Sequence, residues 1–509
     1  MPHELQTNFM SATGKWPLGL AFLSGIIAVF GFAPFELLPL PVMSLALLFY
    51  LWRMSATPVR CAILGFTWGL GCFLGGVSWV YVSMHDVGGL AAPLAALATL
   101  LFCAFLALMP ALAGWAYGHG HNVYGRNGYG SVGQGRSLYG DIALLAGLWT
   151  LTEWLRGWLF TGFPWLAIGY SQTPPSPLAG FVPLVGVYGL GFLLALLAAA
   201  WALAWRRPLV WGLSLGLLVA GFGLRNVAWT EPVGEPLSVS LLQGNIAQSL
   251  KWQPELLVLS FSTYLRLADE HPAQLTVLPE TALPTLFERV PSSYLERLTA
   301  HGDVLLGSAV AKGESAYANG AVAVGTDLNV RRYEKVHLVP FGEYAPPGFA
   351  WFFDWVAIPM SGFTPGQPDQ PPLQLAGQRV MPNICYEDLF GEEIRRSVAE
   401  ATLLINLSNT AWFGNSLAQP QHLQIARVRA LESGRQILRA TNTGMTAAIA
   451  PDGQLMAVLP PFQTGALKVM AQGYTGLTPY SRFGNLPSLL LALMACWPGM
   501  LVWLRRRQK

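Results

Sequence analysis

Long apolar runs fill the first 230 residues of this chain, and one more lies near its end. A helix rises roughly 1.5 Å per residue, so about 20 apolar residues cross the ~30 Å hydrocarbon core of a bilayer. We count eight such runs, at about residues 17–33, 36–53, 59–83, 89–117, 140–160, 179–204, 208–226 and 486–504. The chain is 53% hydrophobic and only 11% charged, far from the balance of a water-soluble globular protein. We therefore expect a membrane α-helical bundle of about eight transmembrane helices.

Lysine and arginine fall on alternate loops between these runs. They are Lys15 before the first run, Arg53 and Arg60 after the second, Arg126 and Arg136 after the fourth, Arg206 and Arg207 after the sixth, and Arg505, Arg506, Arg507 and Lys509 after the last. The loops at residues 31–35 and 83–89 contain neither residue type. Because short loops rich in lysine and arginine stay in the cytoplasm, both termini are predicted to be cytoplasmic. The segment between the seventh and eighth runs is then predicted to lie outside the inner membrane.

The composition changes near residues 230–236, where proline, glycine and two acidic residues end the apolar run. Short apolar strands follow and alternate with helix-like segments. The expected strands are residues 237–242, 275–278, 304–310, 320–324, 330–333, 380–384, 402–405, 436–439, 445–449 and 466–469. The expected helices are residues 254–270, 292–301, 392–401 and 419–433, and Pro451-Asp-Gly453 is a hairpin turn. We predict transmembrane helices 1–7 in residues 1–227, an α/β layered domain in residues 228–482, and the eighth transmembrane helix with a basic cytoplasmic tail in residues 483–509.

Cys385 is the only cysteine of this middle domain. It stands where an apolar run, residues 379–384, meets an acidic segment that is expected to be helical, residues 387–394. A lone thiol at a strand-to-helix junction is a candidate nucleophile. Backbone N–H groups at the start of the helix are expected to stabilise its thiolate. The other cysteines fall inside the apolar runs and are expected to be small buried side chains, namely Cys61, Cys72, Cys103 and Cys496.

Two further residues complete the set that acyl transfer through a thiol requires. Glu280 follows an apolar strand and Pro279, and is the candidate general base that takes the thiol proton and later returns it to the leaving oxygen. Lys335 supplies a fixed positive charge for the carboxylate and for the oxyanion, with the N–H of Tyr386 as a second donor. Each of the three also fits a structural role alone, as a core cysteine, a turn glutamate or a solvated hairpin lysine. Their joint occurrence favours catalysis.

The order of these residues resembles that of the nitrilase superfamily, which presents Glu, Lys and Cys in this sequence. The segments that carry the resemblance are Leu242-Gln-Gly-Asn-Ile246, Lys251-Trp252, Leu278-Pro-Glu280, Tyr317-Ala-Asn-Gly320, Lys335-Val-His-Leu-Val-Pro-Phe-Gly-Glu-Tyr344, Ile384-Cys-Tyr-Glu387 and Ser408-Asn-Thr-Ala-Trp-Phe413. With membrane spans before and after such a domain, nearly the whole chain resembles the apolipoprotein N-acyltransferase family. Soluble nitrilases and amidases lack the spans, so the resemblance is specific.

This resemblance implies a fold and a reaction. The fold is an extracytoplasmic nitrilase-like α/β domain, an αββα sandwich, on the periplasmic side of the bacterial inner membrane. The reaction moves an acyl chain, chiefly the sn-1 chain of phosphatidylethanolamine, onto Cys385 as a thioester, and then onto the α-amine of the diacylglyceryl-cysteine that begins an apolipoprotein. The implied partners are a phospholipid donor, a lipidated protein acceptor and the membrane, with no nucleic acid. The enzyme is expected to act as a monomer without cofactor or metal.

The resemblance also assigns site residues. Glu280 is the base, Lys335 the oxyanion stabiliser and Cys385 the nucleophile. The expected supporting residues around the cysteine are Asn319, Glu343, Tyr386 and Glu387. The expected lipid-facing gate residues are Trp252, Phe341 and Trp412.

Three further features allow two interpretations each. The apolar residues 345–360 form either a lid that dips into the membrane surface or a buried loop. Glu153 and Arg156, one turn apart in the fifth run, are expected to form a structural ion pair, although intramembrane charges also mark functional sites. A basic cluster is expected to be mainly a solvated helix face, with contact to anionic lipid as the alternative, and consists of Arg427, Arg429, Arg435 and Arg439.

Two other functions remain open from the sequence. A membrane-tethered amidase or nitrilase would share the three residues but pass the acyl group to water. A transporter or sensor would use the outer domain only to bind a ligand, and would retain activity after Cys385→Ser. The histidines are scattered, without His-Glu-x-x-His or paired Cys-x-x-Cys spacing, so a metal site gains no support.

Overall fold

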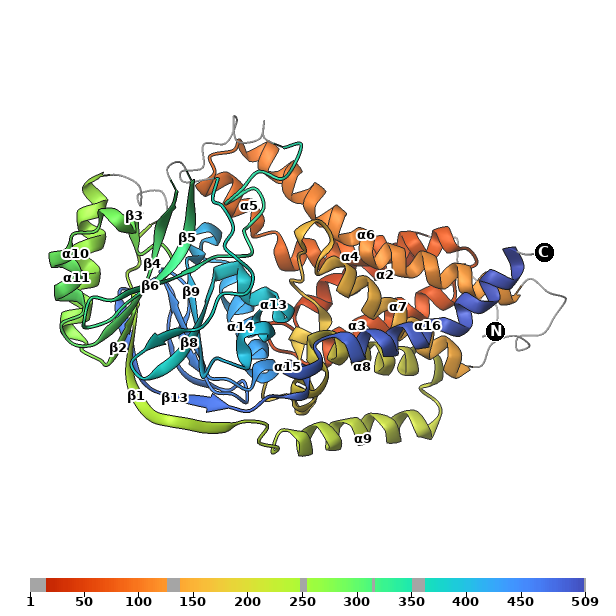
Figure 1. Ribbon diagram of the computed structural model, residues 1–509. Coiled ribbons are helices and arrows are strands. Elements are labelled where there is room, and N and C mark those ends of the chain that lie inside the picture. The colour runs from red at the N-terminus through yellow and green to blue at the C-terminus, as the bar shows by residue number, and fades with distance from the viewer. Residues whose placement is uncertain (1–14, 126–137, 248–253, 314–315, 350–361, 508–509) are drawn as a thin grey trace.

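The structure is a computed structural model that describes residues 15–125, 138–247, 254–313, 316–349 and 362–507. Figure 1 shows two parts, a helical bundle and a domain of two facing sheets. The first and last described helices belong to the bundle, and the middle of the chain forms the sheets. Several residues named above lie outside the described residues, namely Arg126, Arg136, Lys251, Trp252, Lys509 and the lid residues 350–360.

One main helix forms for each predicted apolar run. These helices are α2 (Trp16–Val29), α3 (Pro39–Arg53), α4 (Pro58–Val77), α6 (Ala92–Gly125), α7 (Leu138–Arg156), α8 (Val182–Ala204), α9 (Pro208–Leu224) and α16 (Leu486–Arg507). Short helical segments connect them, namely α5 (Val80–Val82), the π-helix η1 (Ser83–Val87) and the 3₁₀ helices η2 (Leu159–Thr161), η3 (Ile168–Ser171) and η4 (Pro177–Phe181).

By length and composition, seven of these eight helices fall into two groups, and α7 belongs to neither. The helices over Pro58–Val77, Ala92–Gly120 and Pro177–Ala204 are long and apolar enough to cross a membrane. The apolar helices over Trp16–Val29, Pro39–Arg53, Pro208–Leu224 and Leu486–Trp497 are shorter. The number of eight spanning helices therefore stays a prediction.

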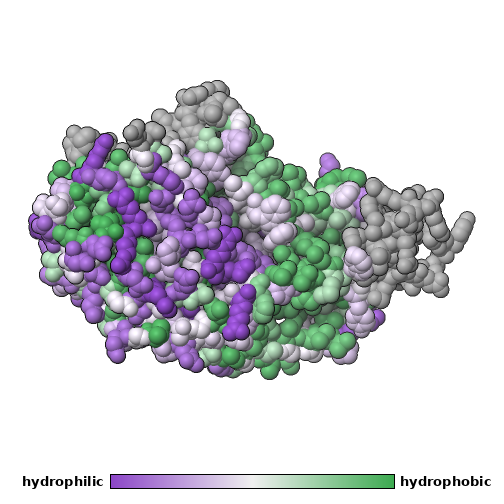
Figure 2. All heavy atoms as spheres, viewed as in Figure 1, coloured by the Kyte–Doolittle hydropathy of each residue, from purple (hydrophilic) through white to green (hydrophobic). Residues whose placement is uncertain are grey.

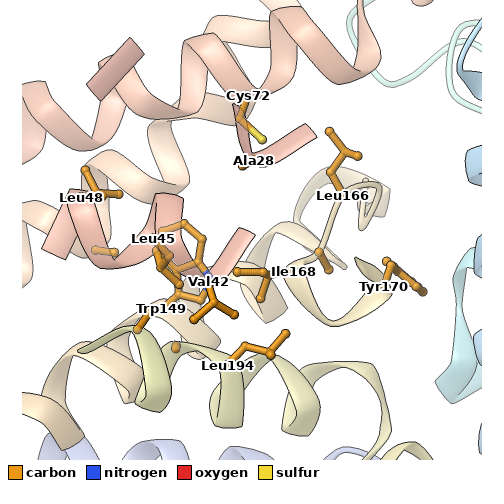
Figure 3. Close-up of a cluster of buried hydrophobic side chains, with 14 of the residues drawn as sticks. Ala28, Val42, Leu45, Leu48, Cys72, Trp149, Leu166, Ile168, Tyr170 and Leu194 are labelled. Carbon is orange, nitrogen blue, oxygen red and sulfur yellow. The ribbon is translucent and has the colours of Figure 1, made fainter. Parts of the chain in front are cut away.

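Glycines let the bundle helices approach one another closely. A Cβ atom on Gly25 of α2 would lie 2.0 Å from the backbone oxygen of Trp68, and one on Gly65 of α4 would lie 2.2 Å from that of Pro110. Prolines occupy the first turns of α3, α4 and α9, where their missing N–H costs no helical hydrogen bond. Figure 3 shows the apolar core that results, with side chains from α2, α3, α4, α7 and α8.

The surface of the bundle differs from that of the sheet domain. On the face drawn in Figure 2, apolar residues cover the bundle and polar residues cover much of the sheet domain. Large apolar side chains stand exposed on the bundle, such as Leu101 at 60%, Leu215 at 63% and Leu493 at 53%. An apolar surface of this extent fits contact with lipid chains better than contact with water.

Two sheets face each other in the middle domain. The first follows the order β13 (Gly465–Thr475), β1 (Glu231–Gln243), β2 (Leu275–Val277), β4 (Asp303–Lys312), β5 (Ala316–Val324) and β6 (Val330–Glu334), with β3 (Leu283–Leu286) beside β4. The second follows the order β12 (Leu455–Leu459), β11 (Thr446–Ile449), β10 (Ile437–Thr441), β9 (Leu403–Ser408), β8 (Gln378–Ile384) and β7 (Leu373–Leu375). Strands β1, β2 and β4 are parallel to one another, as are β8, β9 and β10, so their carboxyl ends share an edge in each sheet.

Helices cover the outer face of each sheet. Those on the first sheet are α10 (Pro254–Glu270) and α11 (Ser292–Leu298), next to η6 (Phe287–Arg289). Those on the second are α13 (Gly391–Val398) and α14 (Ala418–Ser433), and α15 (Pro479–Phe483) leads back into the bundle. Apolar side chains of both sheets pack between them, which confirms the predicted αββα sandwich. The sequence analysis does not predict the short strands β3, β7 and β12, although it predicts others as short, such as β2.

Helix α14 lies between the second sheet and the bundle. Leu423 and Ala430 belong to the same apolar cluster as the residues of the second sheet, whereas Ile425 and Val428 belong to the core of the bundle. Every residue of α14 except Pro420 is buried. The helix is therefore an internal wall that both parts of the molecule share.

The expected solvated basic face is wrong. The four arginines are only 1–7% exposed, and each has a partner inside the molecule. Arg427 pairs with Glu36 at 3.0 Å, Arg429 with Glu432 at 2.7 Å and Arg439 with Asp388 at 2.8 Å, and Arg435 donates to the carbonyl oxygens of Ala401 and Val398 at 2.8 and 2.9 Å. Buried charges need such partners, and here most of them come from distant parts of the chain.

Glu153 and Arg156 do not pair with each other as expected. Arg156 donates to the carbonyl oxygens of Phe163 and Trp165 at 2.7 and 2.5 Å. Glu153 accepts a hydrogen bond from the N–H of Ile168 at 2.8 Å. Both charges therefore fix the backbone of residues 157–171, the loop that follows α7.

The close helix contacts at these glycines predict that a larger side chain there will lower the stability of the protein. We expect Gly65→Ala to lower the thermal midpoint of the detergent-purified protein, because the new Cβ would press on backbone atoms of α6 that cannot rotate away, at a cost of roughly 1–3 kcal/mol. Gly216→Ala in α9 is the matched control, since no atom lies within 4 Å of its Cβ position. Its midpoint should stay equal or rise, because alanine favours a helix by roughly 0.5–1 kcal/mol. Equal midpoints for both variants would contradict the close α4–α6 contact.

Candidate active site

Cys385 stands at a sharp turn at the end of strand β8. The strand ends at Ile384, and a 3₁₀ turn, η7 (Cys385–Leu389), begins with the cysteine. The φ angle of Cys385 is +52°, in the left-handed region that a non-glycine residue rarely adopts. The residue is 9% exposed. The turn therefore places the thiol in a confined site at the carboxyl edge of the second sheet.

Glu280 reaches the site from the first sheet. It follows β2 by three residues and is 6% exposed. Gly307 of β4 makes room for it, since a Cβ there would lie 2.4 Å from the carbonyl oxygen of Pro279. The N–H of Asn409, directly after β9, donates to Glu280 Oε2 at 2.9 Å. The carboxylate is thus fixed between the two sheets.

Lys335 lies between two carboxylates. It follows the last residue of β6, its N–H donates to the carbonyl oxygen of Asn319, and it is 1% exposed. Its Nζ lies 3.3 Å from Glu280 Oε1 and 2.9 Å from Glu343 Oε2. Burial acts to lower the pKa of Lys335, but the charges of Glu343 and Glu280 outweigh it and raise that pKa above its usual value. The ammonium therefore stays charged.

Asn319 joins the two carboxylates from the other side. Its Nδ2 donates to Glu280 Oε1 and to Glu343 Oε1, both at 2.8 Å. Glu343 Oε2 also accepts from the N–H of Val339 at 2.8 Å. The four side chains form one hydrogen-bonded cluster from β2, β5, β6 and the loop after β6.

The thiol of Cys385 is electrostatically coupled to this cluster. Burial, followed by the charge of Glu280, raises its pKa to about 12, and Lys335 opposes the shift. The expectation that a helix start stabilises the thiolate is therefore wrong for the resting site. The segment is a turn of five residues, and the loss of water around the sulfur dominates. The thiol needs a base to take its proton.

Glu387 and Tyr386 hold the residues around the cysteine. Glu387 Oε2 accepts from the N–H of Ile384 at 2.6 Å, and Oε1 accepts from the Tyr333 hydroxyl at 3.0 Å and from the N–H of Val336 at 2.7 Å. The hydroxyl of Tyr386 donates to the carbonyl oxygen of Gly162 in the loop after α7, at 2.7 Å. The residues on both sides of Cys385 are thereby tied to β6 and to the bundle.

The structure describes two of the three expected gate residues, and these two differ in location and exposure. Phe341 is 37% exposed, has a φ angle of +62°, and its ring centroid lies 5.4 Å from that of Phe349. Trp412 is half-buried in the 3₁₀ helix η8 (Thr410–Phe413). The neighbouring Phe413 packs on Trp79 of the bundle at 4.6 Å. Trp252 lies outside the described residues.

Several polar residues near the site are not predicted from the sequence. Asn409 stands in the quoted Ser408-Asn-Thr segment, so the motif contains the signal for its backbone contact to Glu280. The others lie behind the cysteine and follow no motif used above, namely Asn406, Asp388, His422 and Arg439. Only the packing of β9, β10 and α14 brings them together.

The sequence also matches two known domain families. Residues 24–200 match the profile of the apolipoprotein N-acyltransferase N-terminal domain, and residues 238–480 match that of the carbon-nitrogen hydrolase domain. An apolipoprotein N-acyltransferase from Nitrosomonas europaea is 49% identical, over 94% of this chain and 96% of that protein. The chain belongs to the apolipoprotein N-acyltransferase family. Proteins of the same name from Ralstonia nicotianae and Chromobacterium violaceum are 46% and 45% identical, over 94% of this chain and 92% and 93% of those proteins.

Membership confirms the predicted family and the enzyme class, an acyltransferase built on a domain that works through a cysteine nucleophile. Among solved structures, an amidase from Nesterenkonia sp. is 20% identical over 50% of this chain and 96% of its own, with a TM-score of 0.37. The apolipoprotein N-acyltransferase N-terminal profile covers α3, α4, α6 and α7, most of α8 and the end of α2. The carbon-nitrogen hydrolase profile covers both sheets.

The buried carboxyl of Glu387 predicts a pH-dependent stability. Burial raises its pKa from 4.5 to about 7, although Lys335 opposes the shift. Between these values the folded protein holds a proton that the unfolded chain has lost, so stability should fall as the pH rises from about 5 to 8, by a few kcal/mol at most. The measurement is the thermal midpoint across this range. Glu387→Gln should reduce the slope, whereas Glu400→Gln, on the surface, should leave it unchanged. An equal slope in all three proteins would show that another group titrates.

Proposed function

We propose that this enzyme transfers an acyl chain from a phospholipid to the N-terminal amine of a lipoprotein. The donor is the sn-1 chain of phosphatidylethanolamine, and the acceptor is the α-amine of a diacylglyceryl-cysteine. The observation that carries the proposal is the buried cluster of Glu280, Lys335, Glu343 and Asn319, electrostatically coupled to the thiol of Cys385, in a domain that packs on an apolar bundle. The family to which the chain belongs supports the acceptor class.

The first step forms a thioester. The sulfur of Cys385 attacks the ester carbonyl carbon of the phospholipid, while Glu280 takes the thiol proton. The C–O bond to the glycerol then breaks, and Glu280 returns the proton to the leaving oxygen. The products are a lysophospholipid and an acyl group on Cys385. Because the resting thiol has a raised pKa, proton removal belongs to this step and not to the resting enzyme.

The second step passes the acyl group to nitrogen. The neutral α-amine of the lipidated cysteine attacks the thioester carbonyl carbon, and Glu280 takes a proton from the nitrogen. The C–S bond breaks, the sulfur regains that proton, and an amide remains on the lipoprotein. The overall reaction exchanges an ester for an amide and requires no further reactant.

Lys335 stabilises the charge that develops in both steps. Its ammonium is held near the sulfur by Glu280 and Glu343, so it can face the oxyanion of each tetrahedral intermediate without reorganisation. The N–H of Tyr386 is the second donor. Asn319 donates to both carboxylates and so holds Glu280 in position to exchange its proton. Removing one such donor commonly lowers the rate by about 10²- to 10³-fold.

The arrangement of loops supports a site at the outer surface of the bacterial inner membrane. The loop at residues 31–38 has no lysine or arginine and contacts the sheet domain through Ala33 and Glu36. Gly414 of the sheet domain likewise lies against Val82, just before the loop at residues 83–91, which also lacks them. Arg53, Arg206 and other basic residues follow the opposite ends of the helices. By the positive-inside rule, these ends and both termini are cytoplasmic and the sheet domain is periplasmic.

Cys385 itself supplies the decisive test. After incubation with vesicles of phosphatidylethanolamine, the intact protein should gain the mass of one fatty acid, and hydroxylamine should remove it. Cys385→Ala should show neither the adduct nor transfer to a diacylglyceryl peptide. Cys103→Ala is the matched control, because Cys103 is buried in α6 of the bundle, and it should keep both.

The products decide between the proposal and its alternatives. Release of free fatty acid, with no amide on the peptide at saturating concentration, would indicate an amidase-like hydrolase. Full transfer by Cys385→Ala would remove the thioester from the reaction.

Phe341 provides a separate test of lipid contact. We expect Phe341→Ala to raise the KM for phospholipid about tenfold with little change in kcat, since the exposed ring would otherwise bury apolar surface on the acyl chain. Leu328→Ala is the control, because Leu328 has a similar exposure, 39%, and a similar φ, +60°, but lies in the turn between β5 and β6. A change in kcat alone would argue against a role in lipid binding.

A further inference from the structure

A second group of buried polar residues lies behind Cys385, apart from Glu280 and Lys335. It consists of Asn406, Asp388, His422 and Arg439, each at most 2% exposed. Asp388 Oδ1 lies 2.7 Å from His422 Nε2, and Asp388 Oδ2 lies 2.8 Å from Arg439 Nη1. Arg439 Nη2 also lies 2.7 Å from His422 Nδ1. The three side chains therefore contact one another in a closed triangle.

These contacts fix the tautomer of His422. A guanidinium can only donate, so Nδ1 must accept from Arg439. Nε2 then carries the hydrogen that is donated to Asp388. Burial, together with the charge of Arg439, lowers the pKa of His422, which agrees with a neutral ring. His422 is thus a neutral spacer between a buried cation and a buried anion.

Two routes lead from this group to the cysteine. Asn406 accepts from Arg439 at 2.9 Å, and its amide donates to the carbonyl oxygen of Cys385 at 3.4 Å. Asp388 belongs to the same turn as Cys385, three residues later. The left-handed φ of Cys385 requires surrounding contacts to hold it. The group therefore contacts this turn at its first residue, Cys385, and near its last, at Asp388.

The same group connects the turn to the bundle. His422 lies on α14, and its ring centroid is 5.4 Å from that of Trp165 in the loop after α7. The indole of Trp165 donates to Oε1 of the neighbouring Gln421 at 2.7 Å. Arg156 holds the carbonyl oxygen of Trp165 at 2.5 Å. The turn that carries the cysteine is therefore braced against a loop of the membrane part.

We infer that His422 is a positioning residue for the nucleophile. It does not touch the reacting atoms, but it keeps Asp388 and Arg439 in place, and these hold the turn that directs the sulfur toward Glu280 and Lys335. The inference rests on the proposed function only in taking Cys385 as the nucleophile.

The experiment compares two substitutions of His422 in the full-length protein. His422→Leu removes both ring nitrogens, whereas the side-chain amide of His422→Gln can still donate to Asp388. We measure the rate of alkylation of Cys385 by iodoacetamide, read from its peptide by mass spectrometry, and kcat and KM for acyl transfer. His422→Leu should lower the alkylation rate and kcat together by about 10- to 100-fold, with KM changed less than about twofold. His422→Gln should recover most of both rates.

Controls separate positioning from general instability. Ile425→Val on the same helix changes a side chain of the bundle core and should leave alkylation and kcat unchanged. If His422→Leu does not fold, Asp388→Leu combined with Arg439→Met removes both charges, so that neither is left unpaired. This double variant should show the same loss of alkylation.

The outcomes are decisive in both directions. A folded His422→Leu protein with unchanged alkylation and kcat would overturn the inference, as would a folded His422→Gln protein that recovers neither rate. Alkylation needs no lipid, so it tests the inference independently of the proposed function. Slow alkylation of the variants would support the inference, even if the wild-type protein transferred no acyl group. The absence of transfer by the wild-type protein would reject the proposed function.

Discussion

The buried charges of helix α14 depend on partners from the bundle, in addition to the pair that Arg429 and Glu432 form within the helix. Arg427 pairs with Glu36, and Arg429 lies 2.9 Å from the hydroxyl of Tyr170. Glu432 accepts a hydrogen bond from the N–H of Val187 at 2.8 Å. Removing one partner of a buried ion pair typically costs about 3–5 kcal/mol. The sheet domain and the bundle are therefore not independent units, because charged groups of one are paired with or hydrogen-bonded to groups of the other.

The same constraint governs the candidate site. Lys335 is almost fully buried, and it remains charged because Glu280 and Glu343 flank it. Those carboxylates in turn share the amide of Asn319. Burial raises the pKa of the Cys385 thiol, and in the proposed reaction Glu280 takes its proton only when a substrate is bound. In the proposed reaction, a buried site of this kind would protect the thioester from water until the amine arrives.

The position of the site follows from where the two sheets meet the bundle. Tyr386 donates a hydrogen bond to the loop after α7, and Asp388 contacts His422 on α14. Two residues of the turn that begins with Cys385 therefore contact elements that belong to or pack on the bundle. This position supports the proposal that Cys385 acts on substrates whose acyl chains stay in the bilayer. The exposed apolar surface of the bundle fits the same setting.

Local periodicity and short motifs were enough to predict the apolar runs and most strands of the sandwich. They also singled out Glu280, Lys335 and Cys385 as candidates, and the fold brings the first two into contact. The sequence by itself could not reveal that Arg427, Arg429, Arg435 and Arg439 are buried, since their partners lie far away in the chain. It also could not place Asp388, His422 and Asn406 behind the cysteine. These points follow from the three-dimensional packing, because the cost of burying a charge depends on which distant groups surround it.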